Sequence, residues 1–125
     1  MSTIDILKYK KWIKSNNPEQ RLVAIGVFWH SGIRDDEIDE SLKFLLQTDD
    51  NDKNRREAMR MIKESRDETF FNICLDLLDD SDWMVRGLAF QSLKLLNPLI
   101  AESNDRAKKF AQEEIHDFTR YCINN

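Results

Sequence analysis

A glutamate and a histidine near the end of this 125-residue sequence have the spacing that comes closest to a catalytic or metal motif. Glu113 and His116 show the Glu-x-x-His spacing with which helices of di-iron bundles hold metal. Such a site needs a second pair of this kind and two more carboxylates on facing helices, and the other histidine, His30, stands in the different context WHSG. The sequence also contains no nucleophilic triad, glycine-rich phosphate loop or zinc motif. We therefore expect no enzyme, no metal and no cofactor, and we interpret His116 as facing solvent.

The two cysteines do not form a reactive pair. Cys74 and Cys122 lie in apolar helical contexts and lack the close spacing of a metal or redox pair, so we predict buried free thiols. The beginning of the chain, MSTIDILKYKKW, has no apolar run of signal-peptide length, and no stretch has eighteen consecutive apolar residues. We expect a soluble cytoplasmic protein.

Composition and length favour a single all-α domain over residues 1–125. The sequence has three glycines, two prolines and 34% charged residues, with apolar positions spaced for helices throughout. Its formal net charge of -4 argues against a general affinity for nucleic acid or for an anionic membrane, because both require a basic surface. We therefore expect no membrane partner and no direct nucleic-acid partner.

Apolar spacing and capping residues predict about seven helices. Ser2 or Thr3 would cap the first, Asn17 and Pro18 would begin the second, and Gly32 would end it. The expected ranges are roughly 3–15, 18–31, 37–47, 53–64, 67–78, 83–96 and 104–122. These helices would have to position any binding residues.

The clearest of these helices follows an acidic turn in the stretch DDSDWMVRGLAFQSL, residues 79–93. Asp80, Ser81 and Asp82 can accept hydrogen bonds from the free N–H groups of the first turn. The stripe that follows recurs at three- and four-residue steps and is predicted to be buried: Val85, Leu88, Ala89, Ser92 and Leu93, with Leu96 after them.

Two weaker copies of this stretch lie upstream. Each copy has a polar helix start, an arginine and then an alanine three residues later, as in Arg21 with Ala24, Arg55 with Ala58, and Arg86 with Ala89. A helical pair that is repeated along the chain buries its apolar face only against the neighbouring copies.

This pattern resembles the HEAT-repeat family of armadillo-like solenoids, in which an acidic turn is followed by valine-arginine, alanine and leucine. Residues 79–93 match it well, whereas Gln20 and Asn54 stand where the other two copies would have the valine. The resemblance covers roughly residues 17–123 and implies a short right-handed α-solenoid of about three helical pairs, 17–48, 50–79 and 80–123, with 1–16 as an N-terminal capping helix. It further implies a ladder of arginines and turn aspartates, in which Arg86 would meet Asp82 and Asp50 or Asp52.

In such a solenoid the second helix of each pair lines the concave face, and here these helices are acidic. Residues 35–50 carry seven acidic residues against Lys43 alone, and residues 67–82 carry six with no lysine or arginine. The stretch 53–66, on the convex side, carries six basic residues. Helix capping explains the aspartates at helix starts but not Asp39, Glu40 and Asp76. Either the charges serve the helices, or the concave face binds a basic partner.

Candidate contact residues follow from the exposed stripes of the third and fifth helices and from the acidic turn after the fifth. Trp83 is included because it flanks the turn and is the tryptophan expected to be most accessible. The candidates are Asp39, Glu40, Lys43, Gln47, Glu68, Asn72, Asp76, Asp79 and Trp83.

The function that these features favour is binding of a basic protein. Small acidic chains without catalytic residues are typical of bacterial immunity proteins, which neutralise a toxin such as a nuclease by direct binding. The alternatives are a HEAT-like module that binds nucleic acid or takes part in DNA repair, and a scaffold subunit of a larger complex.

Overall fold

The computed structural model describes residues 5–124, and these residues are all-helical without any strand. All-helical structure was predicted, but the predicted number of about seven helices is wrong for the described residues. They form nine α-helices and one 3-10 helix: α1 (Ile6–Trp12), α2 (Pro18–Ser31), α3 (Asp36–Thr48), α4 (Asp52–Ser65), η1 (Glu68–Phe70), α5 (Phe71–Leu77), α6 (Trp83–Leu96), α7 (Ile100–Ser103), α8 (Asp105–Glu113) and α9 (Ile115–Asn124).

The chain divides into two compact units, with the boundary inside α4 between Met61 and Ile62. The prediction of a single domain over residues 1–125 stays a prediction. The sequence up to Met61 holds eleven basic and eleven acidic residues, whereas the sequence from Ile62 onward holds eight basic and twelve acidic residues. The formal net charge of -4 therefore belongs entirely to the second unit.

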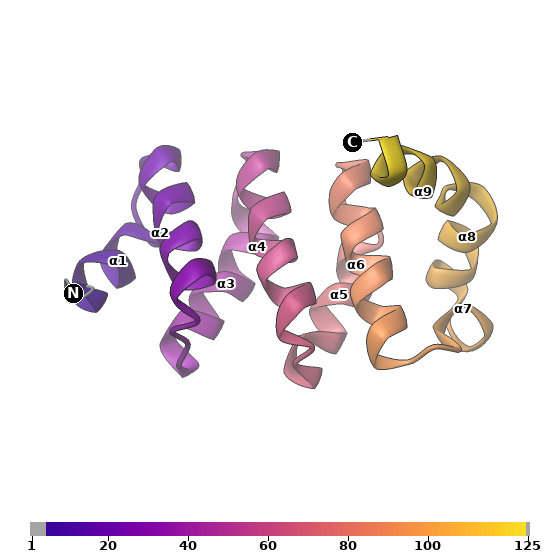
Figure 1. The fold of residues 1–125 in the computed structure, drawn as a ribbon, viewed down its shortest axis with the longest axis horizontal. Coiled ribbons are helices and arrows are strands. Elements are labelled where there is room, and N and C mark those ends of the chain that lie inside the picture. Colours follow the sequence, from indigo (N-terminus) through magenta and orange to yellow (C-terminus); the bar gives the residue numbers. More distant parts are fainter. Residues whose placement is uncertain (1–4, 125) are drawn as a thin grey trace. The chain divides into compact units, whose positions relative to one another are not determined.

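Local signals set the helix ends in the first unit, where α1 packs against α2 (Figure 1). The Asp5 side chain accepts from the backbone N–H of Lys8 and caps α1, while Ser2 and Thr3 lie outside the described residues. Asn17 caps α2, and Gly32 ends it in the left-handed conformation with φ 71°. The predicted start and stop of α2 are confirmed.

The core of the first unit comes from α2, α3 and the start of α4. Its fully buried residues include Ala24, Phe28, Leu42 and Ala58, each 0% exposed. Two hydrogen bonds from the Asn54 side-chain amide, in the first turn of α4, join the ends of these helices. One goes to the carbonyl of Pro18 at the start of α2, and the other goes to the carboxylate of Asp49 directly after α3.

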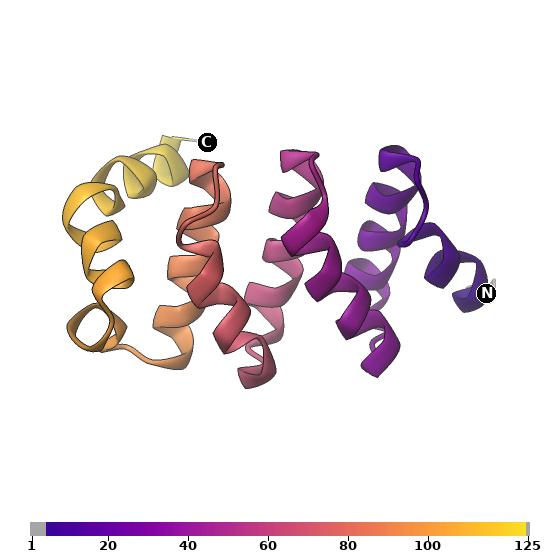
Figure 2. The same cartoon turned by 180° about the vertical axis from the view of Figure 1, so that it is seen from behind.

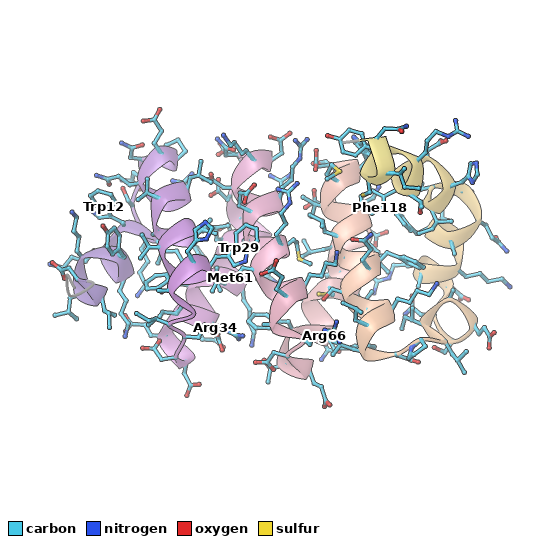
Figure 3. The ribbon with its side chains drawn as sticks, in the orientation of Figure 1. Trp12, Trp29, Arg34, Met61, Arg66 and Phe118 are labelled. Atoms are coloured by element: carbon cyan, nitrogen blue, oxygen red, sulfur yellow. The ribbon has the colours of Figure 1, made fainter. Side chains whose placement is uncertain are left out.

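The second unit contains α5 and α6 packed side by side (Figure 2). Asp82 caps α6 by accepting from the backbone N–H of Val85 at 3.0 Å. The predicted stripe is confirmed for Val85, Leu88, Ala89, Ser92 and Leu93, which are all buried, whereas Leu96 at its end is only half-buried. The predicted fifth helix is divided into η1 and α5. Arg66, which precedes them and directly follows α4, adopts a left-handed conformation with φ 53° (Figure 3).

The single long final helix that the sequence predicts is wrong. The short helix α7 precedes the predicted range 104–122, where no helix was predicted. The range itself forms α8 and α9 instead, with Glu114 leaving helical geometry at φ -125°. This break lets α9 turn back against both α8 and α6. Phe118 of α9 lies directly over Gly87 of α6, where a side-chain carbon on Gly87 would overlap the ring (Figure 3).

Candidate partner-binding surfaces

Three arginines make the same contact at the starts of three helices. Arg21, Arg55 and Arg86 each donate from Nη1 to the backbone carbonyl six residues earlier, at 2.8, 2.7 and 2.9 Å. The acceptors are the carbonyls of Ser15, Asp49 and Asp80. The three copies aligned in the sequence therefore share a local geometry as well as a residue pattern.

Two of these arginines also bind a carboxylate 28 residues further along the chain. Arg21 contacts Asp49 through Nε at 2.8 Å and Nη2 at 2.9 Å, and Arg86 contacts Glu114 through Nη2 at 2.6 Å. The expected pair of Arg86 with the Asp82 carboxylate does not form, because the Arg86 side chain pairs with Glu114 and donates to the backbone carbonyls of Asp80 and Ser81. In each unit the arginine thus joins the start of one helix to a later one.

In the Arg21–Asp49 pair the carboxylate side chain is 1% exposed and the arginine side chain 15% exposed. Burial raises the pKa of the Asp49 carboxyl, but the hydrogen bonds from Arg21, the backbone of Asn51 and the Asn54 amide together outweigh burial and lower this pKa. The hydrogen bond from Arg21 to Asp49 also raises the pKa of the Arg21 guanidinium. This arrangement holds the first unit together and leaves Asp49 no capacity for an external partner.

The predicted contact residues on α3 differ in exposure and in whether another residue of the chain already pairs with them. Asp39 is half-buried and paired with Arg34 at 2.9 Å, and Glu40 lies 3.4 Å from Lys43 in an exposed pair. Gln47 is exposed. The charge on this face is therefore lower than the sequence indicates, since partners from the chain itself neutralise part of it.

Acidic residues at the start of α3 also have basic partners within the unit. Lys10 contacts Asp35 at 2.5 Å and Glu37 at 3.1 Å, and Lys14 contacts Glu37 at 3.2 Å. These hydrogen bonds lower the pKa of both carboxyls and raise that of Lys10. Asp36, by contrast, is exposed and has no ion pair among the described residues.

The exposed face of α3 includes an aromatic residue that the sequence reasoning missed. Phe44 is 67% exposed, next to Glu40 and Gln47 on the same face. It borders a pocket of about 340 Å³ whose other walls include Ile13, Asn16, Thr48 and Asp50. Position 44 falls away from the buried stripe of α3, and this periodicity was the available signal.

Along η1, α5 and the turn after α5, the structure separates predicted contact residues that have no ion pair among residues 5–124 from paired ones. Glu68 and Asn72 are exposed. Asp76 and Asp79 are exposed too, but Arg106 of α8 lies 3.7 Å from the first and 3.1 Å from the second. Although no basic residue occurs between positions 67 and 82, the fold supplies one from elsewhere in the sequence.

Trp83 packs within the second unit. Its ring makes edge-on contacts with Phe118 and Tyr121, at centroid distances of 5.8 and 5.0 Å. Trp83 is half-buried, and so are Trp12 and Trp29. Burial therefore does not distinguish the three tryptophans. Trp83 therefore anchors α9 on α6 and offers a partner only part of its surface.

The basic stretch 53–66 is also largely engaged with the chain itself. Arg56 pairs with Asp52 at 3.4 Å and Arg60 with Glu57 at 2.6 Å. Lys63 donates to the Gln91 side chain at 2.9 Å. The two ion pairs neutralise part of the positive charge that the sequence indicates for the stretch 53–66.

Residues considered for metal or thiol chemistry are dispersed in the structure. Glu113 ends α8, whereas His116 lies on α9 next to Arg120 at 3.1 Å, so the Glu-x-x-His spacing crosses the break at Glu114. Within residues 5–124 no group of three histidine, cysteine or acidic side chains could hold a metal ion. Burial raises the pKa of the Cys74 thiol to about 11, and the prediction that Cys122 is buried was wrong, because it is exposed.

Comparisons with known proteins give no relative from which a role could be transferred. The sequence matches no family model, and searches of curated proteins and of solved structures likewise found no match. None of the helices described is both long enough and apolar enough to span a bilayer.

Proposed function

We propose that this chain is a HEAT-like protein-binding module whose acidic face captures a basic protein partner. In this proposal the helical pairs stack as a short right-handed solenoid, with α3 and α5 on its concave face. The repeated arginine contact supports the proposal, because equivalent local geometry in three copies is what a stacked repeat requires. The partner that we propose is a toxin, neutralised by direct binding in the bacterial cytoplasm.

The observation that carries the binding function is the exposed face of α3. Phe44, at 67% exposure, follows the exposed Glu40 by one helical turn, and the exposed Asp36 lies one turn before Glu40. An exposed aromatic side chain is typical of an interface anchor, and carboxylates on the same helix favour a basic partner. Most of the residues that line the pocket next to Phe44 are polar, Lys14 and Arg21 among them. A lysine or arginine of the partner could lay its aliphatic stem on Phe44 and direct its charge toward Asp50, which also lines the pocket.

The face of α5 supports the same role with fewer charges. Glu68 and Asn72 are exposed and are not engaged in ion pairs within the described part of the chain. Asp76 and Asp79 share Arg106, so a basic partner would have to compete with that residue. We therefore rank Phe44 and Glu68 above Asp76 and Asp79 as contact residues, and we keep Glu40 with them because its partner, Lys43, lies on the same helix at 3.4 Å and its own side chain is 74% exposed.

Affinity capture with matched variants tests this proposal. Phe44→Ala and Glu40→Lys should each lose a basic protein that the wild-type chain retains from its source cell, and raising the salt concentration should weaken retention. The matched controls are Leu99→Ala, at 61% exposure, and Glu113→Lys on α8, which should retain the partner. Retention of the same proteins by all variants, or binding indifferent to salt, would contradict the proposal.

Neutralisation needs a separate readout. Once the captured partner is known, it should arrest growth when expressed alone and permit growth when co-expressed with the wild-type chain. Co-expression with Glu40→Lys should leave growth arrested. A partner that is harmless by itself would rule out the toxin and leave a scaffold role.

A further inference from the structure

A second pocket lies within the second unit, and none of its lining residues belongs to α3 or α5. Its volume is about 520 Å³, within the range of small-molecule sites. The walls come from the last turn of α4, from α6 and from α9. The lining residues are Lys63, Phe90, Gln91, Lys94, Leu95, Ile115 and Thr119.

The pocket combines an apolar wall with two positive charges. Phe90 is buried at 2% exposure, while Leu95 is 44% exposed at the surface. No acidic residue lines the pocket. Lys63 Nζ donates to Gln91 Oε1 at 2.9 Å, and this neutral acceptor holds the ammonium in place without compensating its charge.

The lack of ion pairs at these lysines contrasts with two arginines of the same unit. Arg86 pairs with Glu114, and Arg106 pairs with Asp76 and Asp79. Within residues 62–124, neither Lys63 nor Lys94 has a carboxylate partner, although this unit has twelve acidic residues. Two uncompensated lysines beside an apolar wall would favour a negatively charged ligand.

We propose that this pocket binds a small apolar monocarboxylate, such as a medium-chain carboxylate. Its carboxylate would accept hydrogen bonds from Lys63 and Lys94, and its apolar body would cover Phe90, Leu95 and Ile115. A ligand with several negative charges fits less well, because the surrounding unit is itself acidic. This proposal does not depend on the partner-binding function, since it uses other residues.

Titration of the full chain with decanoate, followed by methyl resonances in NMR spectra, tests the proposal. Saturable shifts are expected at Leu95 and Ile115. Lys63→Met and Lys94→Met should each weaken binding by about tenfold, the usual effect of removing a charged hydrogen bond. Lys108→Met, an exposed lysine of α8, serves as the control and should bind decanoate as the wild-type chain does.

Two further comparisons make the result decisive. Decanol, with the same chain and no charge, should bind much more weakly than decanoate, and Leu95→Glu should abolish binding by placing a negative charge at the surface of the pocket. Because Leu95 and Lys94 are exposed, these variants are expected to fold. Shifts that never saturate, equal binding of decanol, or equal binding by all lysine variants would overturn the proposal.

Discussion

Arg21 and Arg86 occupy equivalent positions in the two units, yet their carboxylate partners lie in different surroundings. The Asp49 side chain is 1% exposed and accepts hydrogen bonds from Arg21, Asn51 and Asn54. The Glu114 side chain is 35% exposed and pairs with Arg86. The same step of 28 residues therefore produces a buried network in one unit and a solvent-accessible pair in the other.

This difference shows that a repeated contact need not have a repeated energy. Removing one partner of a buried charged pair leaves the other charge without compensation, whereas water can replace a lost partner at the surface. The first unit should therefore depend on its arginine contact, and the second should depend more on packing between α6 and α9.

The largest expected effect is that of Asp49→Ala. The change leaves the Arg21 guanidinium and the Asn54 amide without their acceptor, so the free energy of unfolding should fall by about 3–5 kcal/mol. Urea unfolding followed by circular dichroism measures this loss. Asp50→Ala, at the exposed neighbouring position, should change stability by less than about 0.5 kcal/mol. Equal losses in the two variants would contradict the buried-network interpretation.

Next in size is the effect of Gly87→Ala in the second unit. A methyl group at Gly87 would overlap the Phe118 ring, so the free energy of unfolding should fall by about 1–3 kcal/mol despite the better helix propensity of alanine. Gly26→Ala in α2 is the matched change, because no atom lies within 4 Å of its added carbon. That variant should gain about 0.5–1 kcal/mol, and thermal unfolding would show the opposite signs. A stabilised Gly87→Ala protein would mean that α9 does not pack closely on α6.

Sequence periodicity predicted the buried positions of the helices better than it predicted where the helices end. The three aligned alanines, Ala24, Ala58 and Ala89, are all fully buried. The break at Glu114 has no glycine or proline to signal it, and the apolar spacing continues through it. Only the packing of α9 against α6 reveals why the helix turns there.

The candidate surface was less predictable because intramolecular ion pairs depend on tertiary structure. Arg106 reaches Asp76 and Asp79 from a helix far along the sequence, which no local pattern indicates. Phe44 was recoverable in principle, since the period of α3 turns it away from the buried side. Charge counts along a sequence therefore overestimate the charge that a surface offers to a partner.

A smaller effect should appear when Asp49 is protonated. The pKa of Asp49 is lower in the folded chain than in the unfolded chain, where it is about 3.9. The ionised carboxylate therefore stabilises the folded chain fully above the unfolded-state pKa, and this stabilisation is lost as the pH falls toward the folded-state pKa. Comparison of the wild-type chain with Asp49→Asn by urea unfolding should show a stability difference that narrows below about pH 4. Asp35 and Glu37 titrate in both proteins and cancel in the comparison. A difference that stays constant with pH would mean that the Asp49 pKa is not lowered.

The smallest effect is expected for Glu114→Ala, the counterpart of Asp49→Ala in the second unit. Arg86 would keep its contacts with the carbonyls of Asp80 and Ser81, and water would replace the lost carboxylate. The free energy of unfolding should fall by less than about 1 kcal/mol, and less still in 1 M salt, because screening weakens an exposed pair. Glu113→Ala, at an exposed position one residue earlier, controls for the loss of charge. If Glu114→Ala instead cost as much as Asp49→Ala in urea unfolding, solvent exposure would not be what distinguishes the two arginine contacts.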